Sequence, residues 1–283
     1  MFKQLSINNL RDSPLSEPIA LRVPGMTLNS TIFPDLGMPT VDVDFNQLVV
    51  GPNGNPPAHV VHGMDVYVDL LDKRLGVHAD WPSRPRIVVA HSFGAMLVLR
   101  WLLRHRCAGP ADIDGLVLIA TTGGPMYDDV RLRVTPRGPF HFRIGVNYTI
   151  GLWNTPFLTK LVKRFICRGT LAVTRVDFSK LRNKTDGALD RAGWRNTDWR
   201  AMRTFRIAMK DFDVRDQLAS ITVPTIVLNG SEDAIFHPSA GKRLADAMPH
   251  AEYRLVKGGA HGLSLTHGGE VSRAVEDLLR GEE

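Results

Sequence analysis

The hydrophobic positions along the chain fall into short apolar runs that alternate with longer stretches of helical periodicity. Most of the short runs are apolar on both faces, which is typical of strands in a parallel sheet that helices cover on both sides. The predicted strands are IALRV (19–23), TVDVDF (40–45), RIVVA (86–90), GLVLIA (115–120), TIVLNG (225–230) and EYRLV (252–256). Apolar residues at helical spacing occupy 58–75, 92–105, 238–248 and 269–280. This alternation predicts an α/β fold with a doubly wound, mostly parallel sheet.

One interval between predicted strands is much longer than a parallel crossover requires. About 100 residues separate Ala120 from Thr225, whereas a crossover with its helix needs only about a dozen. The surplus contains several aromatic residues among many arginines. We therefore expect two parts, a core formed by residues 1–124 and 216–283 and a helical cap (lid) domain inserted at 125–215.

Composition places the chain among globular proteins with ample core. It has 283 residues, of which 43% are hydrophobic and 23% are charged, as is ordinary for such proteins. No apolar run approaches the roughly 20 residues of a membrane span, so we expect none. The N-terminal segment lacks the apolar stretch of a signal peptide, and two cysteines suit a reducing compartment. Together these features predict a cytoplasmic protein.

The stretch RIVVAHSFGAMLVLRWLLRH (86–105) runs from a predicted strand into a predicted helix without a spacer. Such a turn strains the backbone of its central residue and requires small neighbours, and here Ala90 and Gly94 flank Ser92 at a distance of two residues. The serine then projects near a helix N-terminus, where negative charge is favoured. Ser92 is therefore a candidate nucleophile, although an isolated serine at this position also fits a simple helix cap.

A serine hydroxyl needs a base to act as a nucleophile at neutral pH, and the base needs an acid to orient it. Asp233 follows the predicted strand 225–230, and His261 follows the strand 252–256 in a glycine-flanked loop. Both lie just past the carboxyl ends of strands, where ligands bind in open α/β sheets. The predicted catalytic residues are Ser92, Asp233 and His261. Glu232 remains an alternative acid and His267 an alternative base, while His91 is expected to be a packed or hydrogen-bonded residue of the turn.

The segments AHSFG, VPTIVLNGSEDAIFHP and KGGAHGLSLTH together resemble the nucleophile, acid and histidine segments of the α/β-hydrolase fold superfamily. The resemblance covers about residues 19–281 apart from the cap. It implies the α/β-hydrolase fold, with the cap inserted after the strand that corresponds to the sixth of the usual sheet and with the first β-hairpin missing. Ala90 departs from the usual G-x-S-x-G pattern by replacing the first glycine, which exchanges one small residue for another.

The resemblance also implies an oxyanion hole. One donor is the backbone N–H of Phe93, the residue after the nucleophile, and the other is the backbone N–H of Met26 in the loop after the strand 19–23. An ordinary turn at Pro24-Gly25 is the alternative for that loop. In the predicted cap, the tryptophans expected to contact the substrate are Trp153, Trp194 and Trp199.

These residues predict a serine hydrolase that cleaves a carboxylic ester or thioester through an acyl-enzyme on Ser92, without a cofactor or metal. His59 and His62 have H-x-x-H spacing, but no third ligand follows at zinc-like spacing. A serine nucleophile argues against haloalkane dehalogenase and epoxide hydrolase chemistry. Three alternatives remain open: a carbon–carbon bond hydrolase, a non-hydrolytic lyase or cyclase, and a small-molecule receptor that has lost turnover.

The net charge of +6 is unevenly distributed. Residues 126–218 carry a marked excess of Lys and Arg over Asp and Glu, whereas the rest of the chain carries a small acidic excess. A solvated helix face explains such a surface. A sharper interpretation is a surface that attracts an anionic substrate, a coenzyme A thioester or an acidic acyl carrier protein. No recognition motif accompanies the charge, so nucleic acid is not expected as a partner.

Overall fold

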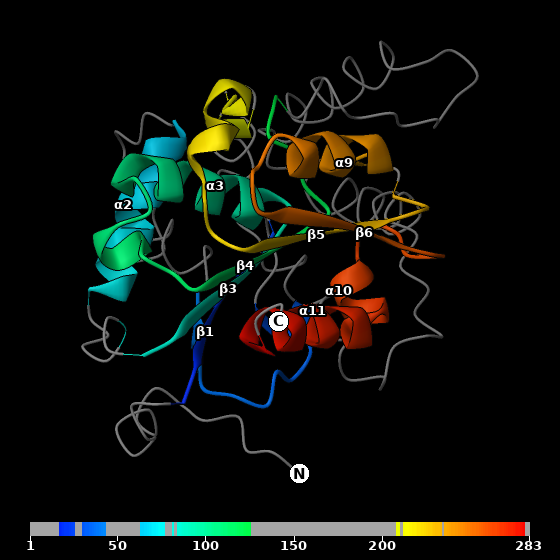
Figure 1. Cartoon of the computed structure of the whole chain (residues 1–283), viewed down its shortest axis with the longest axis horizontal. Helices are drawn as coiled ribbons and strands as arrows, with labels where there is room; N and C mark the ends of the chain where they lie inside the picture. Colours follow the sequence, from blue (N-terminus) through cyan, green and yellow to red (C-terminus); the bar gives the residue numbers. More distant parts are fainter. Residues whose placement is uncertain are drawn as a thin grey trace, which may run out of the picture.

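The computed structural model describes residues 17–25, 30–43, 63–76, 81, 84–125, 208–209, 212–233 and 235–280. Within these residues, one sheet of parallel strands has the order β2-β1-β3-β4-β5-β6 (Figure 1). The strands are β1 (Ile19–Val23), β2 (Thr40–Asp42), β3 (Arg86–His91), β4 (Gly115–Ile119), β5 (Thr225–Gly230) and β6 (Ala251–Val256). Every predicted strand is present in the sheet, which confirms the predicted α/β fold with a parallel sheet.

Helices cover both faces of this sheet, with α2, α3 and α9 on one face and α10 and α11 on the other (Figure 1). Their bounds are α2 (Met64–Leu75), α3 (Phe93–His105), α9 (Pro238–Asp246), α10 (Leu263–Thr266) and α11 (Gly268–Arg280). Short 3-10 turns are η2 (Ser30–Ile32), η4 (Gly109–Ala111) and η6 (Arg215–Ser220). The predicted helices correspond to α2, α3, α9 and α11, whereas the single turn α10 was not predicted. In the described part of the chain, no helix is long and apolar enough to span a bilayer.

The core has two layers because successive strand residues point to opposite faces of the sheet. On β3, Val88 and Ala90 belong to the cluster beneath α2, α3 and α9. Ile87 and Val89 belong to the second cluster, which includes Val271 of α11. Burial on both faces explains why the strands read as continuous apolar runs in the sequence.

The ends of the segment predicted as a cap meet in space. The backbone N–H of Val214 donates to the carbonyl oxygen of Gly123 at 2.9 Å, so the chain leaves the core after β4 and returns beside the same point before β5. Phe212 and Val214 are buried within the core cluster beneath α3 and α9. Most of 125–215 lies outside the described residues, and the cap domain therefore stays a prediction.

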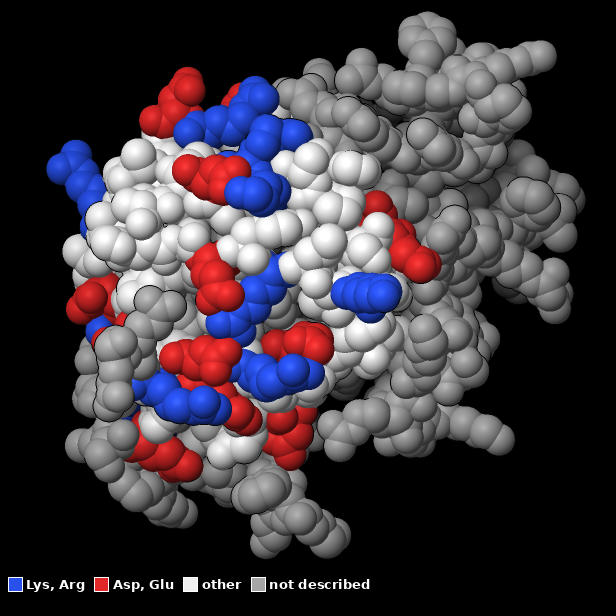
Figure 2. Space-filling view, turned by 45° about the vertical axis from the view of Figure 1, so that its right-hand side comes forward, with Lys and Arg blue, Asp and Glu red and all other residues white. Residues whose placement is uncertain are grey.

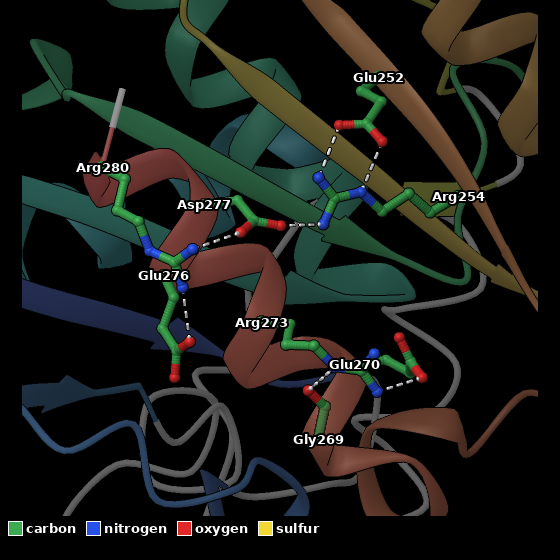
Figure 3. Close-up of polar contacts among 8 residues, drawn as sticks. All are labelled: Glu252, Arg254, Gly269, Glu270, Arg273, Glu276, Asp277 and Arg280. Carbon is green, nitrogen blue, oxygen red and sulfur yellow. Dashed lines mark hydrogen bonds and ion pairs between the residues drawn. The ribbon is translucent and has the colours of Figure 1, made fainter. Parts of the chain in front are cut away.

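An ion pair connects β6 to α11 on the surface (Figure 3). Arg254 of β6 donates to both carboxylate oxygens of Glu252, at 2.6 and 2.7 Å, and to Asp277 of α11 at 2.6 Å. Similar pairing gives the face in Figure 2 its interspersed acidic and basic side chains. Partly exposed pairs of this kind contribute only about 0–1 kcal/mol each. Apolar packing therefore dominates the attachment of α10 and α11 to the sheet.

We expect Leu263→Ala to lower the free energy of unfolding by about 2–5 kcal/mol, because Leu263 is completely buried in the cluster beneath α10 and α11 and its truncation leaves a cavity. Chemical denaturation of the purified chain measures this loss. Leu279→Ala on α11 is the matched control, since Leu279 is 39% exposed, and it should cost less than about 1 kcal/mol. Equal losses for the two variants would show that α10 does not anchor this layer.

Candidate active site

Ser92 lies between the last residue of β3 and the first residue of α3, with φ 53° and ψ −118°. A positive φ is uncommon for a residue other than glycine and costs about 1–3 kcal/mol. The hydroxyl makes no capping hydrogen bond to α3; its Oγ lies 3.0 Å from Nε2 of His261. The strained turn predicted from the sequence is therefore present, and the interpretation of Ser92 as a simple helix cap is wrong.

The end of the neighbouring strand β4 and the residues just after it make hydrogen bonds to this strained turn. The N–H of Ser92 donates to the carbonyl oxygen of Ile119 at 2.8 Å, and Oγ1 of Thr121 donates to the Ser92 carbonyl at 3.1 Å. Thr121 is fully buried, and Ala120 beside it also has a positive φ, of 51°. The sequence analysis missed Thr121, whose only signal is a polar residue directly after a buried strand.

Gly94 lets the start of α3 approach the loop that follows β1. A Cβ at this position would overlap the backbone carbonyl oxygens of Val23 and Pro24, and backbone atoms in a strand end have little freedom to move away. The glycine of the S-x-G pattern therefore brings Ser92 and Phe93 next to the loop predicted to supply the second oxyanion donor. Met26 of that loop lies outside the described residues.

His261 links Ser92 to Asp233. Its Nδ1 lies 3.0 Å from Oδ2 of Asp233, and its Nε2 lies 3.0 Å from Oγ of Ser92. Because a carboxylate only accepts hydrogen bonds, Nδ1 carries the imidazole proton and Nε2 presents its lone pair to the hydroxyl. All three residues are buried, at 9%, 5% and 7% exposure for Ser92, Asp233 and His261. The structure thus brings together the three residues predicted from the sequence.

Asp233 is oriented by its own loop. Its Oδ1 accepts hydrogen bonds from the backbone N–H groups of Ile235 and Phe236, at 2.8 and 3.0 Å. The neighbouring Glu232 has an exposed side chain, but its backbone N–H donates to the carbonyl of Gly259 at 2.8 Å. That bond joins the loop after β5 to the loop after β6, so Glu232 supports the contact between Asp233 and His261 without making it.

The remaining sequence candidates occupy other places. His267 follows α10, and its Nδ1 lies 2.8 Å from the hydroxyl of Thr266, away from the Ser92 contact. Phe93 begins α3 and is fully buried. The predicted site residues outside the described part of the chain are Met26, Trp153, Trp194 and Trp199, together with His59 and His62 of the H-x-x-H spacing.

His91 is a second buried histidine directly beside the nucleophile. Its ring is 1% exposed, and its Nε2 lies 2.8 Å from the backbone carbonyl oxygen of His261. Burial, reinforced by the nearby His261, lowers the pKa of His91 from 6.5 to about 3. The imidazole is therefore neutral at physiological pH, as expected of a hydrogen-bonded residue of the turn.

Comparison with known proteins agrees with this fold. Residues 51–265, about three quarters of the chain, match the model of the family described as "Serine aminopeptidase, S33". The chain belongs to this family. As an S33-family protein with this sheet and turn, it has the α/β-hydrolase fold.

Solved structures show the same fold in this S33-family chain's neighbours. A hydrolase from Pseudomonas aeruginosa is similar with a TM-score of 0.68 and 16% identity, over 94% of this chain and 91% of that one. A thermophilic esterase from Thermogutta terrifontis is similar with a TM-score of 0.67 and 16% identity, over 94% and 90% of the two chains. At this identity the likeness concerns the fold alone.

Curated relatives match the S33-family chain only over short segments. A proposed carbamate hydrolase, RutD, from a Caulobacter species is 32% identical over 81 residues, which cover 29% of this chain and 30% of that protein. The polyketide synthase ThaQ from Burkholderia thailandensis is 32% identical over 80 residues, covering 27% of this chain and 4% of the synthase. The chain thus spans less than a third of the length of either relative.

No metal site is evident in the described part of the S33-family chain, where no three His, Cys, Asp or Glu side chains are grouped to hold an ion. The chemistry that the site can perform follows from the hydrogen-bonded side chains of Ser92, His261 and Asp233. Such an arrangement can remove a proton from the hydroxyl and stabilise the resulting imidazolium.

The low pKa of His91 predicts a specific loss of stability in acid. Between about pH 6.5 and pH 3, unfolded His91 binds a proton and native His91 does not, so stability falls as the pH falls, by at most about 1.4 kcal/mol per pH unit. The titratable groups facing the ring are His261 and Asp233. His91→Leu should therefore take up about one proton fewer on unfolding near pH 5. Denaturation curves between pH 5 and pH 6 measure this, and parallel pH slopes for the two proteins would contradict it.

Proposed function

We propose that this chain is a serine hydrolase that cleaves a carboxylic ester or thioester through an acyl-enzyme on Ser92. The observation that carries the proposal is the continuous hydrogen-bonded chain from Oγ of Ser92 through His261 to Asp233, with both distances at 3.0 Å. The strained backbone of Ser92 supports it further, because a protein has no structural need for a strained serine whose hydroxyl faces a histidine.

In the acylation step, His261 accepts the proton of Ser92 through Nε2 as Oγ attacks the acyl carbonyl carbon. The resulting imidazolium is stabilised by Asp233, whose Oδ2 accepts the Nδ1 proton and preserves the tautomer. The tetrahedral oxyanion receives hydrogen bonds from the backbone N–H of Phe93, at the positive end of α3, and from that of Met26. The alcohol or thiol then leaves with the proton from His261.

Deacylation repeats the proton transfers with water. His261 removes a proton from a water molecule, which attacks the acyl carbon, and Ser92 regains its proton as the acid is released. No metal or cofactor takes part in either step. A lyase or cyclase that used the same residues for acid–base chemistry alone would form no acyl-enzyme, so covalent trapping separates it from the hydrolase proposed here.

The identity of the acyl group and of the leaving group is proposed from the charge of the chain and not from the geometry of the site. The basic composition of residues 126–218 supports an anionic substrate, such as an acyl group with a free carboxylate, a coenzyme A thioester or an acyl group bound to an acidic acyl carrier protein. The tryptophans Trp153, Trp194 and Trp199 are proposed to contact this substrate. A substrate panel should compare neutral and anionic esters of equal acyl length, thioesters, vinylogous diketones and carbamates, the last suggested by the RutD relative.

We expect Ser92→Ala to lower kcat for the best ester of this panel by at least about a thousandfold, because only oxyanion stabilisation and binding remain without the nucleophile. A fluorophosphonate probe should label Ser92 in the wild-type chain, as located by mass spectrometry of the digested protein. Ser264→Ala is the matched control, since Ser264 is also a buried serine, three residues after His261 in the sequence, and should leave labelling intact. Activity above about a tenth of the wild-type kcat in Ser92→Ala would refute the proposal.

Exchange of each acid candidate for its amide tests the assignment of Asp233. Asp233→Asn should lower kcat by several orders of magnitude without loss of folding, because an amide no longer fixes the imidazole tautomer. Glu232→Gln retains the backbone bond to Gly259 and should stay within about threefold of wild type. Steady-state kinetics and thermal unfolding of both variants measure the difference, and a greater loss in Glu232→Gln would move the acid to that residue.

A further inference from the structure

His91 connects the strand that carries the nucleophile to the loop that carries the candidate base. It is the last residue of β3, and its Nε2 lies 2.8 Å from the backbone carbonyl oxygen of His261, in the loop after β6. A carbonyl oxygen only accepts, so Nε2 of His91 carries the proton and donates. The two imidazole rings also pack together, with their centroids 5.0 Å apart.

The other ring nitrogen of His91 faces a different loop. Nδ1 is buried and has no hydrogen-bond partner among the described residues, and an ideal Cβ at Gly25 would lie 2.8 Å from it. Since Nε2 holds the proton and the ring is neutral, Nδ1 presents only a lone pair. The ring is thus fitted between Gly25, in the loop after β1, and His261, in the loop after β6.

A pure packing role does not account for this side chain. An apolar side chain at this position would remove the donor to the carbonyl oxygen of His261, and a buried acceptor that loses its partner costs about 1–3 kcal/mol. The histidine is therefore needed for its donor at Nε2 as well as for the volume of its ring. The position of that donor matters because it acts on the backbone of the same residue whose ring meets Ser92.

We propose that His91 is a positioning residue for the base: its Nε2–H anchors the His261 backbone and so keeps the His261 ring within hydrogen-bond reach of Ser92. Asp233 orients the His261 ring through its Nδ1, while His91 fixes the position of the His261 backbone from which that ring extends. This inference rests on the proposed serine hydrolase function. Misplacement of a catalytic group by about 1 Å costs on the order of a hundredfold in rate, far more than one hydrogen bond contributes to stability.

Three variants test the inference. His91→Gln places an amide donor near the position of Nε2, His91→Asn carries the same amide too far back to reach the carbonyl, and His91→Leu removes the donor altogether. Each is examined for the rate of fluorophosphonate labelling at Ser92, for kcat per titrated active site, for KM and for the midpoint of thermal unfolding. Titration of active sites separates slower catalysis from a smaller folded fraction.

We expect kcat per active site and the labelling rate to fall about 10- to 100-fold in His91→Asn and His91→Leu, with KM within about threefold of wild type. His91→Gln should recover to within about threefold of wild type. If His91→Leu does not fold, the comparison of His91→Gln with His91→Asn decides alone.

Equal per-site rates in His91→Gln and His91→Asn would overturn the positioning role, whether both match wild type or both are reduced. A fall in thermal stability with unchanged per-site rates would likewise reduce His91 to a packing residue. Failure of the wild-type chain to label at Ser92 would instead refute the serine hydrolase function, and the inference with it.

Discussion

The strained backbone of Ser92 is the constraint on which the rest of the site depends. Its φ of 53° and ψ of −118° place the hydroxyl outside both the strand and the helix that it joins, at a cost of about 1–3 kcal/mol. Bonds to Ile119 at the end of the adjacent strand and to Thr121 just after it offset this cost. Burial of α3, most of whose residues are in the core, supplies the larger compensation.

The other two members of the site depend on the parallel sheet. The carboxyl ends of β3, β5 and β6 lie at one edge, so the loops that follow them converge. The bond from the Glu232 N–H to Gly259 joins the acid loop to the base loop. The contact of His91 with the His261 carbonyl then joins the base loop to the nucleophile strand. The contacts of His261 with Ser92 and with Asp233, both at 3.0 Å, therefore depend on two further hydrogen bonds between the loops. Neither of these further bonds involves a proposed catalytic side chain.

Two buried histidines near one serine differ in the environments that surround them. His261 has a carboxylate at Nδ1 and a hydroxyl at Nε2, which is the arrangement that a base requires. His91 has a carbonyl at one nitrogen and no partner among the described residues at the other, and burial keeps it neutral with a pKa of about 3. An imidazole thus suits proton transfer at His261, whereas at His91 it suits a hydrogen bond that positions the backbone of His261.

Local pattern in the sequence was sufficient for the strands, for most helices and for Ser92 and His261, and it limited the acid to Asp233, the predicted residue, or its neighbour Glu232. Burial on both faces of a parallel sheet leaves a continuous apolar run, and an abrupt change to helical periodicity marks the turn at Ser92. The spacing of Asp233 and His261 behind successive strands was equally visible. The single turn α10 was missed because four residues are too few to establish a helical period.

Only the tertiary structure decided which of two adjacent acids meets the histidine, because Glu232 and Asp233 are equivalent in sequence until the turn buries one and exposes the other. It also decided that Thr121 supports the turn and that His91 reaches His261, a residue 170 positions away. Sequence by itself determined the residue types and their order along the chain. Contacts between residues so far apart arise only when the sheet brings their strand ends together, and no local periodicity records them.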